Sequence, residues 1–468
     1  MGTSLSRSAT NHTIGFSVLD QLSYSDRSLP FSHVLSADRV RERFATSDVL
    51  FGYGENDVWN TGVTLWSFIG QVLQDGKQRS CNAAVTHTSR YLLEHGLQPP
   101  SPDSGQYCRA RHKLRADVLR QLVGEIAEQI ARASPGRWRW HGKHVKLVDG
   151  FTFTMPDTPE NQQAFPQLAL QAPGVGFPIA RACAVLSLAT ACIHDVALGP
   201  YAGKETGETA LLRNVLDSFE PGEVLLADRY FCSFFMLAIL KLRGIDGCIR
   251  LHQLRQIDQA KVTRLGPNDY IDLWHRPQRA RWMSPALYET LPEHMEIRIV
   301  TFEATIDHQS EPLQVVTTLL DPKKYPAVDI GRLYGYRWHA ELDILAIKQS
   351  LNLEHLRCKS PEMIGREFWT TLLAYNMVRL VCAQAACAHD KLPRHMSFTL
   401  GCNSLLSQWL MPPDASIRQT LGRHHLFQIA CHEVGNRPGR IEPRVIKRRP
   451  KPYKLMTKPR NQYKQAKA

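Results

Sequence analysis

Apolar runs between about residues 144 and 250 are the feature that most constrains the fold of this 468-residue chain. They predict three strands in succession, then a helix in GETALLRNVLDSF, a strand in EVLLAD, a helix in SFFMLAILKLRG and a strand in DGCIRL. Asp149 ends the first apolar run, HVKLVDG, and Asp228 ends the fourth strand. Strands and helices in this order build an α/β sheet, and we expect the two aspartates to lie side by side at strand ends.

Three strands, helix, strand, helix and strand is the order of a ribonuclease-H-like fold. We therefore expect an α/β catalytic core of this kind in two parts, residues 141–250 and 329–395. A β-rich insertion at 251–328 interrupts it, because MEIRIVTFEAT and PLQVVTTLL alternate at the period of strands. Residues 1–140 read as a helical N-terminal domain, and the basic stretch CRARHKLR makes it a candidate DNA-binding domain, with a solvated basic face as the alternative. Residues 396–468 form a C-terminal region with a basic tail that we expect to be flexible.

A stretch after the insertion, YGYRWHAELDILAIK, places a carboxylate among cations. Tyr334, Arg337, Glu341 and Lys348 are spaced by three, four and seven positions. On a helix turning about 100° per residue, this spacing keeps them within a sector of roughly 60°. Taken alone, such a stripe is more typical of a solvated, ion-paired surface. The two aspartates upstream favour an active site instead, because Glu341 would then be the third carboxylate of one group.

Asp149, Asp228 and Glu341 are thus the candidate catalytic residues and metal ligands. Three ionised carboxylates need a countercharge, and Mg²⁺, or alternatively Mn²⁺, provides it through the oxygen ligands that hard cations prefer. Two ions about 4 Å apart would activate an attacking hydroxyl and stabilise the leaving oxygen of a displacement at phosphorus. The sequence therefore predicts phosphodiester chemistry with two divalent ions per active site.

The net charge of +13 is concentrated at the C-terminal end of the chain. Residues 435–468 contain twelve Lys or Arg and one acid, Glu442, so they carry +11 of the total. Such a tail favours nucleic acid as the partner, and a merely solubilising tail is the alternative. Without a run of about 18 apolar residues or a signal peptide, we expect an intracellular protein with no membrane partner.

Together these residues resemble the DDE transposases of the insertion-sequence-4 family, which are hairpin-forming cut-and-paste bacterial enzymes. The family's Y-x2-R-x3-E-x6-K hallmark is matched by Tyr334, Arg337, Glu341 and Lys348. The similarity extends through LVDGFTFTMPDTPENQQAFPQ, GPYAGKETGETALLR and VLLADRYF. The family's β-strand insertion fits the spacing of 113 positions between the second and third acids. Phe151 departs from the family, which frequently has a small hydroxyl residue there.

The resemblance implies metal-dependent cleavage at element ends, a hairpin intermediate and strand transfer into target DNA. It implies that Tyr334, Arg337 and Lys348 hold DNA phosphates, and that a tryptophan of the insertion stacks on a flipped base. Trp274 and Trp282 are the candidates for that stacking. The implied partners are double-stranded DNA, as terminal inverted repeats and target, and a second copy in a homodimeric synaptic complex. The implied location is the bacterial cytoplasm, in association with the nucleoid.

Two other interpretations are compatible with parts of this pattern. A metal-dependent, structure-specific nuclease of the same fold would cut DNA without joining it, and strand-transfer products would distinguish the two. A DNA-binding repressor that has lost catalysis would keep the basic tail, but the intact set of three acids speaks against it.

Overall fold

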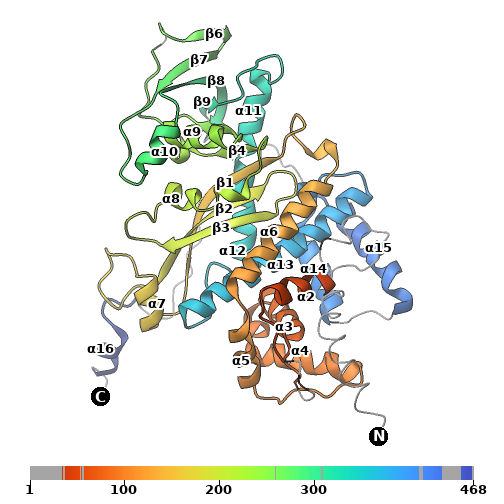
Figure 1. Cartoon of the computed structure of the whole chain (residues 1–468). Helices are drawn as coiled ribbons and strands as arrows, with labels where there is room; N and C mark the ends of the chain where they lie inside the picture. Colours follow the sequence, from red (N-terminus) through yellow and green to blue (C-terminus); the bar gives the residue numbers. More distant parts are fainter. Residues whose placement is uncertain are drawn as a thin grey trace.

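The centre of the molecule is a mixed sheet whose first five strands lie between residues 145 and 250 (Figure 1). The computed structural model describes residues 34, 37–52, 54, 57–258, 260–306, 309–410, 415–434 and 455–465. The five strands are β1 (Val145–Thr154), β2 (Ile179–Ser187), β3 (Ile193–Pro200), β4 (Val224–Ala227) and β5 (Asp246–Arg250). β1 is antiparallel to β2 and parallel to β4, β2 is antiparallel to β3, and β4 is parallel to β5. The expected succession of strands and helices is confirmed.

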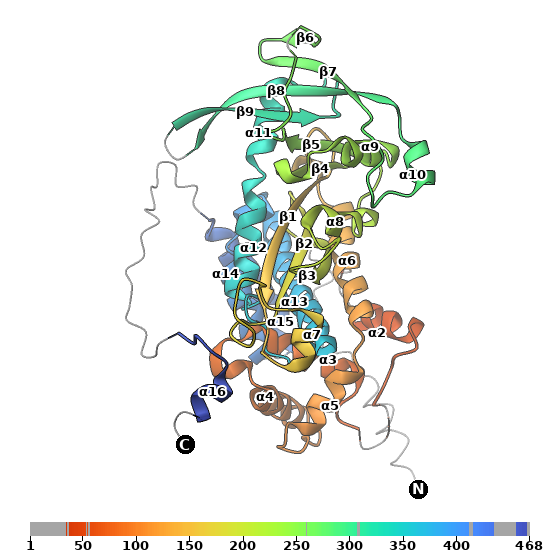
Figure 2. The same cartoon turned by 90° about the vertical axis from the view of Figure 1, so that its left-hand side faces the viewer.

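Helices cover both faces of these five strands (Figure 2). One face carries α8 (Glu208–Arg213) and α9 (Phe234–Leu242), and the other carries α6 (Ala116–Ala133), α12 (Trp338–Ser350) and α13 (Pro361–Ala388). The sequence of β1 shows why both faces are covered. Leu147 and Phe153 belong to the core under α6, α12 and α13, whereas Val148 belongs to the core under α8 and α9. Successive strand residues point to opposite faces of the sheet. A strand with apolar residues at both odd and even positions therefore needs helices on each side.

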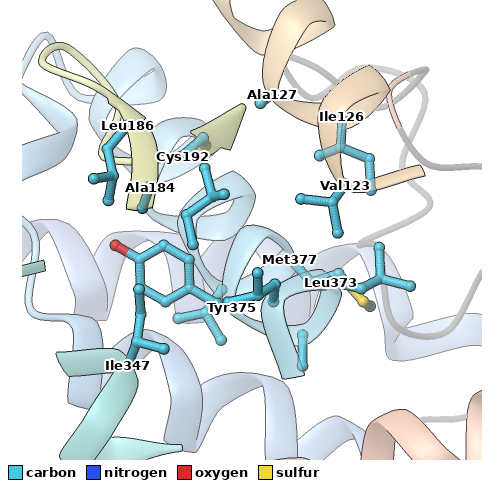
Figure 3. Close-up of a cluster of buried hydrophobic side chains, with 14 of the residues drawn as sticks. Val123, Ile126, Ala127, Ala184, Leu186, Cys192, Ile347, Leu373, Tyr375 and Met377 are labelled. Atoms are coloured by element: carbon cyan, nitrogen blue, oxygen red, sulfur yellow. The ribbon is translucent and has the colours of Figure 1, made fainter. Parts of the chain in front are cut away.

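The larger core lies between the sheet and the face covered by α6, α12 and α13 (Figure 3). The side chains that meet there include Val123, Ile126 and Ala127 of α6, Ala184 and Leu186 of β2, Ile347 of α12, and Leu373, Tyr375 and Met377 of α13. The hydroxyl of Tyr375 donates to the carbonyl of Ala191 at 3.0 Å, which satisfies a buried polar group. In the described chain α13 alone is long and apolar enough to span a membrane, by length and composition only, and 89% of its apolar window is buried inside the protein.

The N-terminal helices share this core. They are α2 (Ala37–Thr46), α3 (Thr61–Leu73), α4 (Cys81–Glu94) and α5 (Gly105–Lys113), with the short 3-10 helices η1 (Gly76–Arg79) before α4 and η2 (Gly136–Trp138) after α6. Every residue of α3 is buried, and α3 packs against α13. Where it is described, the region before residue 140 is helical, as expected. The expected boundary near residue 140 does not separate two cores, because α6 packs against both α13 and β3.

Four strands in the insertion extend the central sheet. They are β6 (Thr263–Gly266), β7 (Asp269–His275), β8 (His294–Ile306) and β9 (Gln309–Thr317), with α10 (Pro285–Thr290) between β7 and β8. β9 pairs antiparallel with β5, with Ile249 opposite Val316, and the complete strand order is β3-β2-β1-β4-β5-β9-β8-β7-β6. The insertion is thus rich in strands, as expected, but its strands continue the central sheet because β9 satisfies the free edge of β5.

A buried arginine ties the insertion to the chain that follows it. Arg298 of β8 is 0% exposed and binds the carboxylate of Asp269 in β7 with two hydrogen bonds, at 2.8 and 2.7 Å. Its remaining guanidinium nitrogen donates to the carbonyls of Leu319, at 3.2 Å, and Tyr325, at 2.7 Å. These carbonyls lie in the connection from β9 to α11 (Ala327–Gly335). Arg298 therefore holds the end of the insertion against the start of the helix that leads to α12.

The remaining elements surround this framework. They are α7 (Pro159–Ala164), η3 (Leu216–Ser218), η4 (Arg229–Phe231), η5 (Pro393–His395), α14 (Phe398–Leu410), α15 (Ala415–Cys431) and α16 (Arg460–Gln465). α14 and α15 pack against α13. Most of the basic tail, residues 435–454 and 466–468, lies outside the described residues. The expectation that this tail is flexible therefore falls outside the described residues as well.

Candidate active site

The two aspartates lie on neighbouring parallel strands. Asp228 directly follows β4, as expected, but Asp149 lies in the middle of β1 and not at its end, because the strand continues through FTFT. Leu147 of β1 is opposite Leu226 of β4. Continuing this parallel register by two residues brings Asp149 level with Asp228. The expectation that the two carboxylates are neighbours follows from this register, even though only one of them terminates a strand.

Backbone amides orient both carboxylates. Oδ1 of Asp149 accepts a hydrogen bond from the amide of Gly150 at 2.9 Å. Oδ1 of Asp228 accepts one from the amide of Tyr230 at 2.8 Å, so Asp228 also caps the short helix η4. In each carboxylate this hydrogen bond uses one oxygen, and both residues are partly exposed. Oxygen atoms of both side chains can therefore bind a ligand from solvent.

The third acid, Glu341, lies in the first turn of α12, and α12 packs against β1. The expected single helix from Tyr334 to Lys348 is wrong in one respect, because α11 ends at Gly335 and α12 begins at Trp338. Around this junction the amides of Arg337 and Ala340 donate hydrogen bonds to carbonyls three residues earlier, each at 3.0 Å. This tighter turn keeps the chain compact, but Tyr334 belongs to α11 and Glu341 to α12.

Arg337 links the glutamate to the aspartates. Its guanidinium donates to Oε1 of Glu341 at 2.9 Å. Burial raises the pKa of Asp149 to about 6, the positive charge of Arg337 opposes this rise, and the negative charges of Asp228 and Glu341 add to it. Arg337, Asp228 and Glu341 are therefore all close enough to Asp149 to act on it electrostatically. Such a group binds positive charge readily, because any cation relieves the mutual repulsion of the acids.

Without metal, Asp149→Asn is expected to stabilise the protein by about 1 to 3 kcal/mol above pH 6. The folded-state pKa of about 6 lies above the usual 3.8, so the folded state holds a proton more firmly than the unfolded state. The resulting stabilisation is complete below about pH 4 and is lost as the pH rises through 6, whereas asparagine shows no such loss. Urea unfolding of both proteins in EDTA between pH 4.5 and 8 measures the difference; a stability difference that does not grow with pH would contradict the prediction.

The other residues of the motif all have protein partners. Tyr334 is 6% exposed, and its burial raises the pKa of its hydroxyl. Nζ of Lys348 lies 3.6 Å from Oε1 of Glu354. The predicted contacts of Tyr334, Arg337 and Lys348 with DNA phosphates therefore stay predictions, and in this structure Arg337 and Lys348 are ion-paired within the protein.

The two candidate tryptophans differ in accessibility. Trp274 is 1% exposed, its ring nitrogen donates to Asp272 at 2.9 Å, and the guanidinium of Arg255 lies 3.7 Å from the ring centre. Its ring faces are covered in this structure, so the expectation that Trp274 stacks on a base does not fit it. Trp282 is half-buried, with the guanidinium of Arg213 4.0 Å from its ring centre. Stacking on Trp282 stays a prediction.

The donor set suits a hard divalent cation. Asp149, Asp228 and Glu341 offer only carboxylate oxygens, and each is partly exposed. Among the residues that the structure describes, no three His, Cys, Asp or Glu side chains are placed closely enough to enclose an ion as they stand. Glu341 has one oxygen on Arg337 and the second available for a ligand. The three residues therefore fit Mg²⁺ or Mn²⁺ by their chemistry and by their shared charge.

A further acid lies beside this group and was not predicted from the sequence. Glu208, the first residue of α8, is half-buried, and its side chain lies against Gly150. The sequence signal that could have indicated it is weak. A glycine directly after an acid in a buried strand suggests a close approach by another group, but it does not identify that group.

Comparison with known proteins identifies the family. Residues 140–377, just over half of the chain, match the transposase DDE domain. The chain is 25% identical over 351 residues to the transposase InsG for insertion sequence element IS4 of Escherichia coli strain K12, covering 74% of this chain and 76% of that protein. It is 23% identical over 139 residues to the putative transposase InsZ of the same organism, covering 30% of this chain and 46% of that protein.

Among solved structures, the cryo-EM structure of the piggyBac transposase synaptic complex with hairpin DNA aligns with a TM-score of 0.43 and 10% identity, over 90% of this chain and 85% of that one. The match to the DDE domain covers β1 to β9, α12 and most of α13, and so includes all three acids. The chain belongs to the DDE transposase family, as its sequence led us to expect.

Proposed function

We propose that this transposase cuts DNA at the ends of its element and joins the freed ends to target DNA, through a hairpin intermediate and with divalent metal. The observation that carries the proposal is the meeting of Asp149, Asp228 and Glu341 from β1, β4 and α12 around one electrostatically coupled site. The arrangement of the first five strands supports a ribonuclease-H-like catalytic domain. In that arrangement β2 and β3 are antiparallel neighbours on one side of β1, and β4 and β5 are parallel neighbours on the other.

In the proposed reaction the three acids hold Mg²⁺ or Mn²⁺, two ions per site. Bound ions would activate the attacking hydroxyl and stabilise the leaving oxygen. Asp149 is held by the amide of Gly150 and Asp228 by the amide of Tyr230, so both present an oxygen in a fixed direction. Carboxylates that are already oriented in this way need little rearrangement when DNA binds. The same carboxylates can serve cleavage, hairpin opening and joining, because each step is a displacement at phosphorus with a different hydroxyl.

Cations near the acids are the proposed phosphate contacts. Arg337 binds Glu341, and its positive charge also acts on Asp149. Arg250, at the end of β5, is close enough to Tyr334 to lower the pKa of its hydroxyl against the effect of burial. We infer that incoming phosphates draw Arg337 and Lys348 away from Glu341 and Glu354, which would free both oxygens of Glu341. Charge-assisted bonds to phosphate are strong enough to replace such partly exposed ion pairs.

The direct test is a reaction of the purified full-length protein with linear DNA that carries the element's two inverted repeats. With Mg²⁺ we expect hairpin ends on the element and, with added plasmid, joined products; EDTA should abolish both. Nicked or cut ends with no joining of a labelled 3′-hydroxyl end would favour the nuclease instead. Specific binding with no cleavage in Mg²⁺ or Mn²⁺ would favour the repressor. We propose a homodimer as the active species, and cross-linking with paired end DNA tests it.

Removal of residues 435–468 is expected to flatten the salt dependence of DNA binding. Each phosphate contact that a cation makes adds about −0.9 to the slope of log K against log salt concentration. The tail holds twelve Lys or Arg, so losing even half of these contacts would change the slope by about 5. Fluorescence anisotropy with end DNA between 50 and 300 mM KCl measures the slope. An unchanged slope would show that the tail does not contact phosphates.

A further inference from the structure

We propose that Glu208 is a fourth carboxylate of the active site and helps Asp149 and Asp228 to hold the divalent cations. This inference rests on the proposed metal-dependent function and adds a residue to its site. Glu208 begins α8, which packs against β1, β2 and β3 on the face of the sheet opposite α12. Its side chain therefore approaches the aspartates from the side that Glu341 does not occupy.

The position of Glu208 depends on the absence of a side chain at Gly150. A Cβ atom at residue 150 would lie 2.6 Å from Cγ of Glu208 and closer still to its carboxyl carbon. Gly150 does not have a positive φ, so its backbone conformation does not require glycine. The glycine is needed for space, and the group that fills this space is the carboxyl group of Glu208. Residue 150 directly follows Asp149, so the carboxyl group of Glu208 lies beside the next residue of β1, on the face of the strand opposite the Asp149 side chain.

The charges that act on Glu208 place it near Asp228. Burial raises its pKa, the positive charge of Arg181 opposes the rise, and Asp228 adds to it. The thiol of Cys183, which is opposite Gly150 in the sheet, is close enough to Glu208 and Asp149 that both add to the effect of burial on its pKa. Glu208 therefore lies near Asp228, and it shares Cys183 as a neighbour with Asp149.

Glu208 makes no hydrogen bond or ion pair with the described residues that would explain its burial as structural. Its neighbour Glu205 differs, because it is exposed and paired with Arg213. Arg181, which could have paired with Glu208, instead donates to the carbonyl of Thr206 at 3.3 Å and lies over the ring of Tyr201. A half-buried acid without a protein partner carries a desolvation cost that a ligand can offset, and we assign a divalent cation shared with Asp149 and Asp228 as that ligand.

The first test measures metal binding without catalysis. Electron paramagnetic resonance of free Mn²⁺ titrates the sites of the full-length protein in the absence of DNA. Glu208→Gln is expected to weaken Mn²⁺ binding about tenfold or more, the size typical for a lost supporting ligand. Glu205→Gln, three residues away and ion-paired, is the matched control and should bind Mn²⁺ as the wild type does. Equal Mn²⁺ affinities for Glu208→Gln and the wild type would overturn the inference.

The second test measures cleavage of end DNA against Mg²⁺ concentration. Glu208→Gln is expected to raise the half-saturating Mg²⁺ concentration about tenfold and to recover much of its rate at high Mg²⁺. End binding in EDTA should be unchanged. A purely structural role would instead lower the rate at every Mg²⁺ concentration without moving the half-saturating value, and that result would also overturn the inference.

Gly150→Ala tests the same contact without removing the acid. The new methyl group would displace the flexible end of Glu208, so this variant should shift the Mg²⁺ requirement in the same direction. In a Glu208→Ala background the methyl group meets no carboxyl group, and Gly150→Ala should add little further effect. Additive effects of the two substitutions would mean that Gly150 acts independently of Glu208. If the wild type itself neither binds Mn²⁺ nor cuts end DNA, the proposed function fails; if it does both and the Glu208 variants match it, only this inference fails.

Discussion

Cleavage of end DNA is expected to fall about a thousandfold or more when Glu341 is replaced by glutamine. In the wild type the guanidinium of Arg337 donates to Oε1 of Glu341 at 2.9 Å. Glutamine has the same size as glutamate and keeps an oxygen that can accept this hydrogen bond. It lacks the negative charge that completes the proposed set of metal-binding carboxylates. Binding of end DNA should be nearly unchanged, or slightly tighter, because Arg337 is released from its ion pair to contact phosphate.

Single-turnover cleavage and anisotropy on the same DNA measure the two effects of Glu341→Gln separately. Glu362→Gln is a suitable control, since Glu362 lies in the first turn of α13, is exposed and forms an i, i+4 ion pair with Arg366. That control should cut at the wild-type rate. If Glu341→Gln also cut at the wild-type rate, the assignment of α12 to the active site would have to be abandoned.

The second large effect concerns stability. Replacing Arg298 with methionine is expected to lower the free energy of unfolding by about 3 to 5 kcal/mol, because it leaves the carboxylate of Asp269 buried without its partner. Both side chains are buried, and two hydrogen bonds join them. The carbonyls of Leu319 and Tyr325 would lose a donor as well.

Urea unfolding measures the stability of Arg298→Met, and Arg332→Met provides the contrast. Arg332 is exposed and lies 3.6 Å from Asp329, so its loss should cost less than about 1 kcal/mol. The double variant Arg298→Met, Asp269→Leu should be more stable than Arg298→Met, since it removes the unpaired charge. If the single variant were no less stable than Arg332→Met, the ion pair would not be what holds the insertion to α11.

The sequence was sufficient for the elements that depend on local pattern. The succession of strands and helices from β1 to β5 follows from apolar periodicity, and the placement of Asp228 follows from the end of its apolar run. Asp149 was harder to place, because Gly150 resembles the end of a strand although the backbone continues unchanged. The break between α11 and α12 was not predictable from spacing, since Tyr336 and Arg337 keep helical backbone angles while their hydrogen bonds tighten.

Features that depend on distant parts of the chain could not be read from the sequence. The pairing of β9 with β5 joins residues more than sixty positions apart, and nothing in either strand specifies the other. The burial of Trp274 depends on which face of β7 packs against the core, where Tyr270 is also buried. Glu208 and Gly150 meet only because α8 returns across β1. In each case the local pattern allowed several arrangements, and tertiary packing selected one.

The pairing of β9 with β5 also limits how such a protein can evolve. A deletion of one residue inside β9 would turn every following side chain of that strand to the opposite face and would disturb both cores at once. Changes in length between Arg250 and Thr263, outside the ladder, leave that pairing intact. Differences in length are therefore expected in that connection, while the lengths of the strands stay constant.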